Sequence, residues 1–217
     1  MKELADGLYQ LSGFPPNAIN VYLAGDVLID AGGRLDGRRI LKQLNGRTVT
    51  EHALTHSHPD HDGASKQVCE KLGLPLACHE QDVDAVVNGR KPYSRMSAVS
   101  EKVFGGPRYK VDRVLHAGDR VGDFVVIETP GHTDGHVAYW RESDRALILG
   151  DVLNSMNLLT MIPGLREPPG FFTPDPSENR RSARKLAELE PALVCFGHGP
   201  PVRDTKKFTD FVAGLPE

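Results

Sequence analysis

The sequence predicts an α+β protein in which β-sheets pack under helices. Short apolar segments of strand length come in clusters along the chain, and segments with helical periodicity stand between them. This arrangement favours sheets covered by helices over a helical bundle. The 217 residues, 39% of them hydrophobic, are enough for a sizeable core. Because no linker or internal repeat divides them, we expect a single domain over residues 1–217.

In the first half of the chain, turn-forming residues separate the apolar runs. The Pro15-Pro16-Asn17 turn separates the first two strands, and Asp30-Ala31-Gly32-Gly33 ends the third. Apolar residues that recur at helical spacing predict the helices between the later strands. The expected strands are 8–11, 19–23, 27–29, 53–55 and 76–78, and the expected helices are 34–44, 63–72 and 80–87.

Strands dominate the second half of the chain again, and two helices near its end complete the pattern. Residues 88–108 are irregular, with glycine and proline at both ends, and predict a lid or a loose helix. Ser177 is the expected N-cap of the first of the two late helices. The strands expected here are 111–115, 124–129, 137–140, 146–149 and 192–196, and the helices are 177–189 and 204–213.

One segment, residues 152–176, combines five prolines and two glycines with many large apolar side chains. Loops are seldom this apolar, so the segment is expected either to line a substrate pocket or to cover the core. In the first case the pocket residues would be Asn154, Leu158, Met161, Phe171 and Phe172.

Composition disfavours several classes of function. The net charge of −3 provides no basic surplus for phosphate contacts, so a nucleic-acid partner is disfavoured. The first residues contain no apolar leader segment, and no run approaches the ~20 apolar residues of a membrane span. Cys69, Cys78 and Cys195 stand far apart without a CxxC pair, which fits free thiols in a reducing compartment. A cytoplasmic location and a small-molecule partner are therefore expected, and the oligomeric state is left open, with a homodimer among the alternatives.

The segment THSHPDHDG, residues 55–63, crowds metal-capable groups into one turn. On an extended segment His56 and His58 point to the same side and can chelate one metal ion. Pro59 turns the chain, so Asp60 and His61 point elsewhere and can reach a second ion. The segment therefore indicates one half of a metal site.

Three further donors follow apolar strands and stand next to a glycine. His132 lies in ETPGHTDGH, Asp151 in ALILGD and His198 in LVCFGHGPP. Because strand ends can converge on one edge of the sheets, these donors are expected to join the first group. Nitrogen and oxygen donors of this kind suit two Zn²⁺ ions, and Mn²⁺ and iron accept them as well.

HxHxDH, followed by GH, GD and GHG, resembles the motif set of the metallo-β-lactamase fold superfamily over the full length of the chain. The resemblance implies a four-layer αββα sandwich with the metals between the loop edges of two sheets. It also implies that Asp30, in a DxG motif, orients a ligand histidine. By motif position the first metal would take His56, His58 and His132, the second would take Asp60, His61 and His198, and Asp151 would bridge them.

A lone histidine near a strand end is more often a packing residue than a ligand, and the ordered set of seven donors is what outweighs that interpretation here. The remaining histidines, His52, His79, His116 and His136, are expected to be structural. For His136, four residues after His132, an orientation into the cleft is the alternative. The cysteines are expected to fill the core.

Two divalent cations can hold a bridging hydroxide and polarise a substrate oxygen. The resemblance therefore implies a hydrolase, with Asp60 helping to move a proton. A bridging Asp151 resembles the glyoxalase-II-like hydrolases and lactonases rather than the zinc β-lactamases. Asn154 stands where quorum-quenching lactonases carry a tyrosine, and the chain ends soon after GHG, where glyoxalase II continues into a helical domain. The expected substrate is a small ester, thioester or lactone.

Three other classes of protein use the same fold or ligands. A persulfide-dioxygenase-like oxidoreductase would use one iron at the first site alone. A phosphodiesterase or ribonuclease would need a basic groove, which the charge does not favour. A non-enzymatic metal-binding module is the third alternative.

Overall fold

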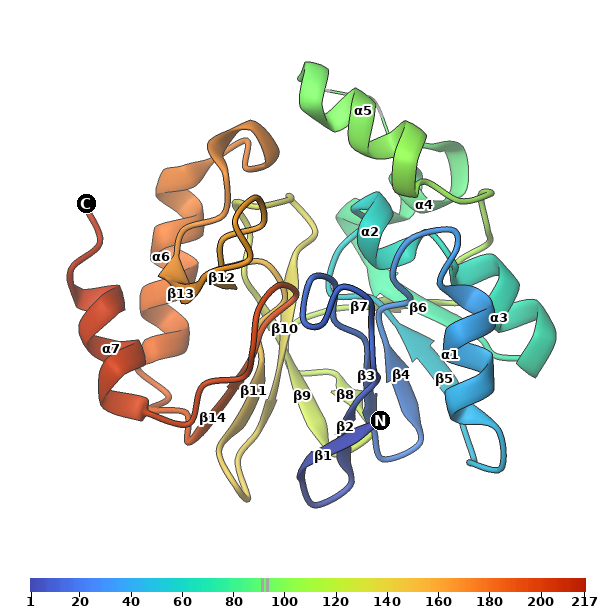
Figure 1. Ribbon diagram of the computed structural model, residues 1–217, viewed down its shortest axis with the longest axis horizontal. Helices are drawn as coiled ribbons and strands as arrows, with labels where there is room; N and C mark the ends of the chain where they lie inside the picture. The colour runs from blue at the N-terminus through green and yellow to red at the C-terminus, as the bar shows by residue number, and fades with distance from the viewer. Residues whose placement is uncertain (91, 93) are drawn as a thin grey trace.

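Two β-sheets lie face to face in the centre of the molecule, and helices cover the outer face of each (Figure 1). The computed structural model describes residues 1–90, 92 and 94–217. The first sheet has seven strands in chain order, antiparallel from β1 to β4 and parallel from β4 to β7. Its strands are β1 (Lys2–Ala5), β2 (Leu8–Gln10), β3 (Tyr22–Ala24), β4 (Val27–Ile29), β5 (Glu51–Ala53), β6 (Leu76–His79) and β7 (Arg113–Leu115).

The second sheet has five strands in the order β14-β11-β10-β9-β8, antiparallel except for the parallel pair of β11 and β14. A separate antiparallel pair, β12 (Asn154–Met156) with β13 (Pro163–Arg166), lies near the second sheet. The strands of the second sheet are β8 (Arg120–Val121), β9 (Phe124–Glu128), β10 (Val137–Arg141), β11 (Ala146–Ile148) and β14 (Leu193–Cys195).

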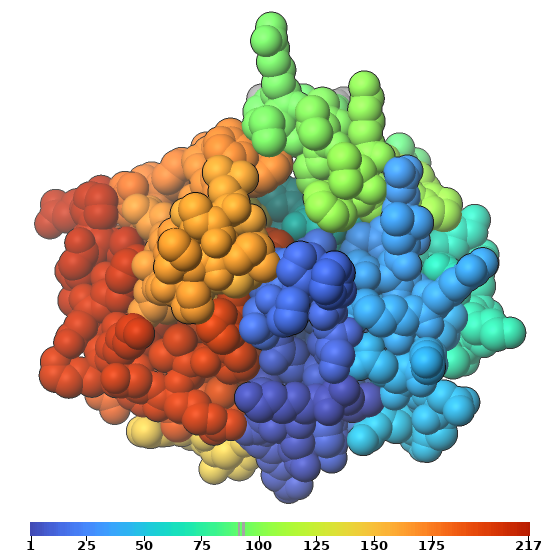
Figure 2. Space-filling view, in the orientation of Figure 1, coloured from blue at the N-terminus to red at the C-terminus, as the bar shows by residue number. Residues whose placement is uncertain are grey.

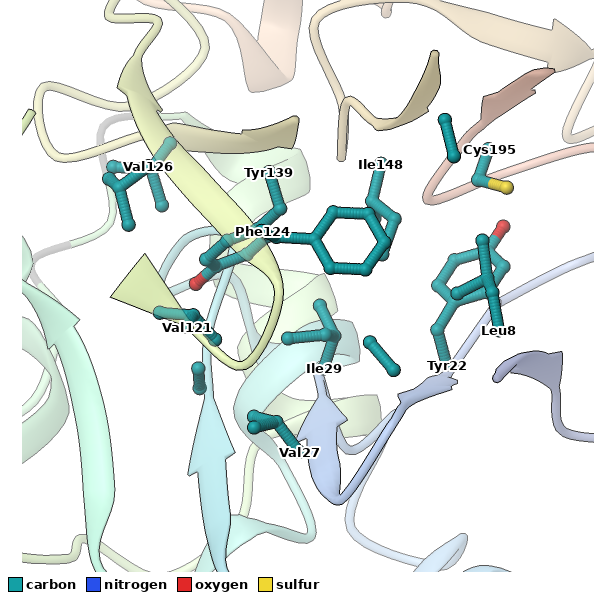
Figure 3. Close-up of a cluster of buried hydrophobic side chains, with 14 of the residues drawn as sticks. Leu8, Tyr22, Val27, Ile29, Val121, Phe124, Val126, Tyr139, Ile148 and Cys195 are labelled. Atoms are coloured by element: carbon teal, nitrogen blue, oxygen red, sulfur yellow. The ribbon is translucent and has the colours of Figure 1, made fainter. Parts of the chain in front are cut away.

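Three apolar clusters fill the three interfaces of this sandwich. In β4, Val27 and Ile29 point into the cluster between the sheets, whereas Leu28 points to the cluster under the helices of the first sheet. This alternation follows from the period of two of a strand, and both faces are buried because both are covered. Figure 3 shows the central cluster, where Phe124 and Tyr139 of the second sheet meet the side chains of the first. The four-layer αββα arrangement is therefore present.

The helices divide between the two outer faces, with α5 and the short helices near the rim (Figure 1). Ile40 of α1 and Val68 of α3 pack on the first sheet, and Leu186 of α6 and Phe208 of α7 pack on the second. The helices are α1 (Gly37–Leu44), α2 (Pro59–Asp62), α3 (Ser65–Leu72), α4 (Val83–Asn88), α5 (Arg95–Phe104), α6 (Pro176–Ala187) and α7 (Thr205–Ala213), with 3₁₀ turns η1 (Glu80–Asp82) and η2 (Gly170–Phe172).

The structure corrects the expected elements at three places. The N-cap of α6 is Asp175, whose side chain accepts a hydrogen bond from Glu178 N, and Ser177 lies inside the helix. The segment 152–176, expected as a loop, contains β12 and β13. Within 88–108, residues 95–104 form a regular helix, whereas positions 91 and 93 of the expected lid lie outside the described residues.

Two other expectations concern cysteines and membrane spans. Cys69, Cys78 and Cys195 are all free and buried, as expected of core residues. Among the residues that the structure describes, no helix is both long enough and apolar enough to cross a bilayer.

Candidate metal centre

The seven candidate ligands follow the ends of four strands that meet at one edge of the sandwich. The His56–His61 segment follows β5, and Asp151 and His198 follow the parallel strands β11 and β14. His132 comes after β9, across a turn where Gly131 has φ +124°. Gly197 permits the closest approach, because a Cβ there would overlap the carboxylate of Asp151. Strand ends thus bring residues that are distant in sequence to one place.

Three histidines form the first donor group. One ring nitrogen from each of His56, His58 and His132 lies within 4.8 Å of the others. His58 presents Nδ1 to Nε2 of His132 at 2.9 Å. All three side chains are buried. A set of imidazole nitrogens this close together is what one zinc-like cation requires.

The second donor group consists of Asp60, His61 and His198, whose ligand atoms also lie within 4.8 Å of one another. His198 Nε2 lies 3.3 Å from Asp60 Oδ2. Asp60 belongs to the first turn of α2, where Pro59 occupies the N1 position and starts the helix. This turn is why His58 and Asp60 serve different groups.

Asp151 lies between the two groups. Its Oδ2 is 3.4 Å from Nε2 of His132 and 3.1 Å from Nε2 of His198. Its Oδ1 is 3.5 Å from His61 Nε2. One carboxylate therefore faces donors of both groups.

Asp30 fixes the orientation of two of these histidines. Its Oδ2 accepts a hydrogen bond from His61 Nδ1 at 2.8 Å and another from the Thr55 hydroxyl at 2.8 Å. Since the Thr55 hydroxyl donates its only hydrogen to Asp30, it accepts one from Nδ1 of His56, 3.0 Å away. Both histidines therefore carry the proton on Nδ1 and turn Nε2 toward the centre. Asp30 has φ +59°, a strained conformation for an aspartate, which aims the carboxylate at this position.

His132 and His198 are oriented in the same way by other partners. His132 Nδ1 lies 3.0 Å from the Thr173 hydroxyl, which itself donates to the Pro169 carbonyl, so His132 is the donor of this pair. His198 Nδ1 donates to the carbonyl of Ala18. Each leaves Nε2 facing the centre.

The two donor groups differ in their protonation, because burial governs the first group and nearby carboxylates govern His198 of the second. Burial lowers the pKa of His56 and His58 well below the ordinary value and lowers the pKa of His132 to about 3. These imidazoles are neutral and offer lone pairs. Burial also opposes charge at His198, but Asp151 and Asp60 raise the pKa of His198 to about 10. In the metal-free protein the second group therefore holds protons that a cation would displace.

Several buried polar atoms at the centre lack a hydrogen-bond partner among residues 1–90, 92 and 94–217. They are Nε2 of His56, Nε2 of His61 and Oδ1 of Asp151. A buried polar atom without a partner is costly, and such atoms in native proteins call for an explanation. Because all three face the centre, divalent cations fit here and would satisfy them.

Two residues that support the centre were not identified as such from the sequence. Asp82 is buried and accepts a hydrogen bond from Ser57 N at 2.7 Å and from the Thr133 hydroxyl at 3.4 Å, which ties together the loops that carry His58 and His132. His136, expected to be structural, does not present its ring to the cleft as a member of either donor group. Its Nε2 accepts a hydrogen bond from Asp151 N at 3.0 Å. In the sequence, the only indication that His136 supports the centre was its position four residues after His132.

Five of the seven donors, all but His56 and His61, line the wall of a cavity that opens to solvent. Asn154, Leu158 and Phe172 of the 152–176 segment lie in its wall, together with Arg90 and Glu101. Met161 and Phe171, expected with them, are not among the described lining residues. Phe171 is 46% exposed and stacks against Phe172 instead. The other histidines expected to be structural are His52, His79 and His116. His52 hydrogen-bonds with Ser65 Oγ, His79 hydrogen-bonds with Glu128 Oε1, and the ring of His116 lies edge-on to that of His79 with centroids 6.3 Å apart.

The chain is similar to known proteins at the levels of family, sequence and fold. The sequence profile of the metallo-beta-lactamase superfamily matches residues 14–198. A probable metallo-hydrolase of Bacillus subtilis, YflN, is 29% identical over 228 residues, which is 92% of this chain and 86% of that protein.

Two further relatives carry more specific descriptions. A hydroxyacylglutathione hydrolase of Erythrobacter litoralis is 32% identical over 143 residues, which is 63% of this chain but only 47% of that enzyme. The crystal structure of TTHA1623 in a di-iron-bound form superposes with a TM-score of 0.64 at 28% identity, covering 90% of this chain and 88% of that one.

Proposed function

The chain belongs to the metallo-β-lactamase superfamily, and from this premise we propose that it is a two-metal hydrolase of small esters, thioesters or lactones. The observation that carries the proposal is the position of Asp151, whose carboxylate faces both donor groups. A carboxylate can offer one oxygen to each of two cations, which a histidine cannot do.

The donor chemistry supports an assignment of ligands. Imidazole and carboxylate groups suit Zn²⁺, and they also accept Mn²⁺ and iron. TTHA1623 has the same fold and is known in a di-iron-bound form, so the fold does not identify the metal of this chain and metal analysis is needed. We assign His56, His58 and His132 to one cation, Asp60, His61 and His198 to the other, and Asp151 to both.

When bound, two divalent cations supply a hydroxide at neutral pH and polarise a carbonyl oxygen. The chain itself supplies orientation: Asp30 and Thr55 hold the rings of His56 and His61 in one tautomer. Asp60 is the donor best placed to move a proton, because it lines the cavity and 18% of its side chain is exposed while the other six donors are buried.

The class of bond that the enzyme hydrolyses is proposed from its similarity to named relatives. The relative from Erythrobacter litoralis is named a hydroxyacylglutathione hydrolase, a name that points to a thioester substrate, and this chain is 32% identical to it over 143 residues. Asn154 lines the cavity at the position where the resemblance to lactonases would place a tyrosine. Thioesters and simple esters are therefore the first substrates to assay.

Metal analysis of protein purified without added metal or chelator, followed by assays with ester, thioester and lactone panels, tests the proposal. We expect about two Zn²⁺ or Mn²⁺ per chain and hydrolysis that chelation abolishes. About one iron per chain, with oxygen consumption on sulfur substrates, would contradict it and favour the oxidoreductase.

Asp60→Asn tests the proton-transfer role in a variant that keeps an oxygen ligand for the second cation, and the metal content is measured beside the rate. We expect kcat to fall by ~10²–10⁴-fold while both metals are retained, because general acid–base catalysis contributes about that much. The matched control is Asp134→Asn, an exposed aspartate in the loop that carries His132, which should keep its rate. A fully active Asp60→Asn enzyme with both metals would remove this role.

A further inference from the structure

We infer that an apolar groove beside the metal centre binds the acyl chain of the substrate, so that the preferred substrates are esters or thioesters of unbranched fatty acids. The inference rests on the proposed hydrolase function and specifies its substrate class. We define the acyl groove by Phe14, Leu35, Met96, Val99 and Val103, which line it together with Asp60 and His198.

The acyl groove has room for a substrate that the donor cavity lacks. The cavity at the donors has a volume of only about 50 Å³, too little for the body of a substrate. The acyl groove has about 480 Å³, within the range of ~300–1,000 Å³ that ligand sites occupy. The two share Asp60, Leu158 and His198, so a substrate whose reacting bond lies at the donors can extend into the groove. Figure 2 shows the hollow between α5 in green, the 152–165 segment in orange and the N-terminal loop in blue.

The walls of the acyl groove are formed by exposed apolar side chains. Met96, Val99 and Val103 repeat at the spacing of one helical face in α5, yet they are 46%, 50% and 49% exposed. The helix buries none of its side chains against the part of the chain that the structure describes. On the other wall, Phe14 is 91% and Leu35 is 85% exposed. Apolar side chains concentrated beside a reactive centre indicate a binding surface rather than a packing surface.

The polar end of the donor cavity decides which half of the substrate enters the groove. Arg90, Ser97 and Glu101 line that cavity, and they suit a polar leaving group such as a carrier thiol. The hydrocarbon is then the acyl half. Residues 96–103 cover about 10 Å of helix axis, the length of roughly eight extended methylenes. Affinity for the chain should therefore rise with length and then level off.

The experiment compares p-nitrophenyl esters from acetate to dodecanoate, below their critical micelle concentrations. We expect kcat/KM to rise about fourfold per methylene, the factor that corresponds to ~0.8 kcal/mol for a buried CH₂, and to level off near ten carbons. A flat series would overturn the acyl groove while leaving the hydrolase intact. An alkyl acetate series that responds to chain length when the acyl series does not would overturn the assignment of the acyl half.

Val103→Asp is the test variant, and Val114→Asp, an apolar side chain 40% exposed on β7 outside the groove, is the matched control. We expect the ratio of decanoate to acetate ester kcat/KM to fall at least tenfold in the first and to stay unchanged in the second. An unchanged ratio in both, with a change of oligomeric state in light scattering of Val103→Asp alone, would assign the groove to a subunit contact and overturn the proposal.

A binding measurement keeps the acyl groove testable if no ester or thioester is hydrolysed, a result that would contradict the proposed function. Calorimetric titration with decanoate should show saturable binding that Val103→Asp weakens at least tenfold and Val114→Asp leaves unchanged. Absence of decanoate binding to the metal-loaded wild-type protein, or equal binding by both variants, would overturn the acyl groove itself.

Discussion

At the scale of single residues, orientation of the donors depends on partners contributed by other loops. Asp82 is the clearest case, since its carboxylate holds the backbone between His56 and His58 and also the loop of His132. The ordered motifs predicted all seven donors that the structure brings together, because donors next to glycine after strands leave a trace in sequence. Asp82 left none, since its partners are distant in the chain and it stands among ordinary helix-start residues.

Asp82→Ala should destabilise the fold and loosen the metal site together. The change leaves the buried N–H of Ser57 without an acceptor, which costs ~1–3 kcal/mol of unfolding free energy. Loss of such an orienting group should weaken zinc affinity by ~10–100-fold. Urea unfolding of the metal-free protein and competition with a chromophoric chelator measure the two effects. Asp82→Asn, which keeps an acceptor oxygen, should show less of both.

The control for the two Asp82 variants is Asp84→Ala, which changes an exposed aspartate on α4 two residues after Asp82. Its unfolding free energy should stay within ~0.5 kcal/mol of the wild type and its zinc affinity should not change. If Asp82→Ala behaved like Asp84→Ala, Asp82 would have no part in positioning the loops.

At the scale of elements, α5 is joined to the described part of the protein by ion pairs and by hydrogen bonds such as that from Arg34 N to the Phe104 carbonyl, and none of its side chains is fully buried. Arg90 binds both Asp62 of α2 and Glu101 of α5, and Arg108 binds Glu101 as well. Because glycine and proline flank it in the sequence, this helix was expected only as a loose helix, the alternative to a lid. The signal that could have found it was the capping box of Ser94 and Ser97 at its start. The expected edges of the other elements differed by up to three residues because neighbouring strands set where pairing begins, as at β3 and β5.

Glu101→Gln should release α5 locally without unfolding the protein. The Arg90 and Arg108 contacts of Glu101 are partly exposed, so the loss is discounted to about 1 kcal/mol of local opening free energy, or roughly fivefold faster exchange. Hydrogen exchange of residues 95–104 measures it. Lys102→Gln, a neighbouring exposed side chain, is the control. Equal protection of α5 in both variants would show that the ion pairs do not hold the helix.

At the scale of the whole molecule, the order of strands and helices predicted only sheets covered by helices, and the αββα layers came from the resemblance of the ordered motifs to a family that the comparison then confirmed. Each sheet was predicted without one of its strands. In the seven-stranded sheet β1 is too polar to stand out, and in the five-stranded sheet β8 has only two residues. The expectation of a single domain over residues 1–217 stays a prediction.

Metal loading of the whole protein should release protons. Asp151 and neighbouring carboxylates raise the pKa of His61 well above its ordinary value and the pKa of His198 to about 10, so both are protonated at pH 7.5 in the metal-free protein. Their ion pairs stabilise the metal-free fold fully below pH 6.5. The contribution of His198 is lost as the pH rises through about 10, and that of His61 is lost at a pH well above 6.5. Cation binding should therefore release about two protons at pH 7.5 and strengthen with pH.

Calorimetry in buffers of different ionisation enthalpy counts the protons. A His198→Ala variant should release about one proton fewer on binding its remaining cations. Proton release near zero in the wild type would contradict the protonated second group.

The division of the chain between the two sheets has a mechanical consequence. Every strand of the seven-stranded sheet lies before residue 116, and every strand of the five-stranded sheet lies after it. The donors divide in the same way, with His56, His58, Asp60 and His61 on one side of that boundary and His132, Asp151 and His198 on the other. Bound cations would therefore cross-link the two halves of the chain. Loss of the cations would let the halves separate at the apolar interface between the sheets before either sheet unfolds.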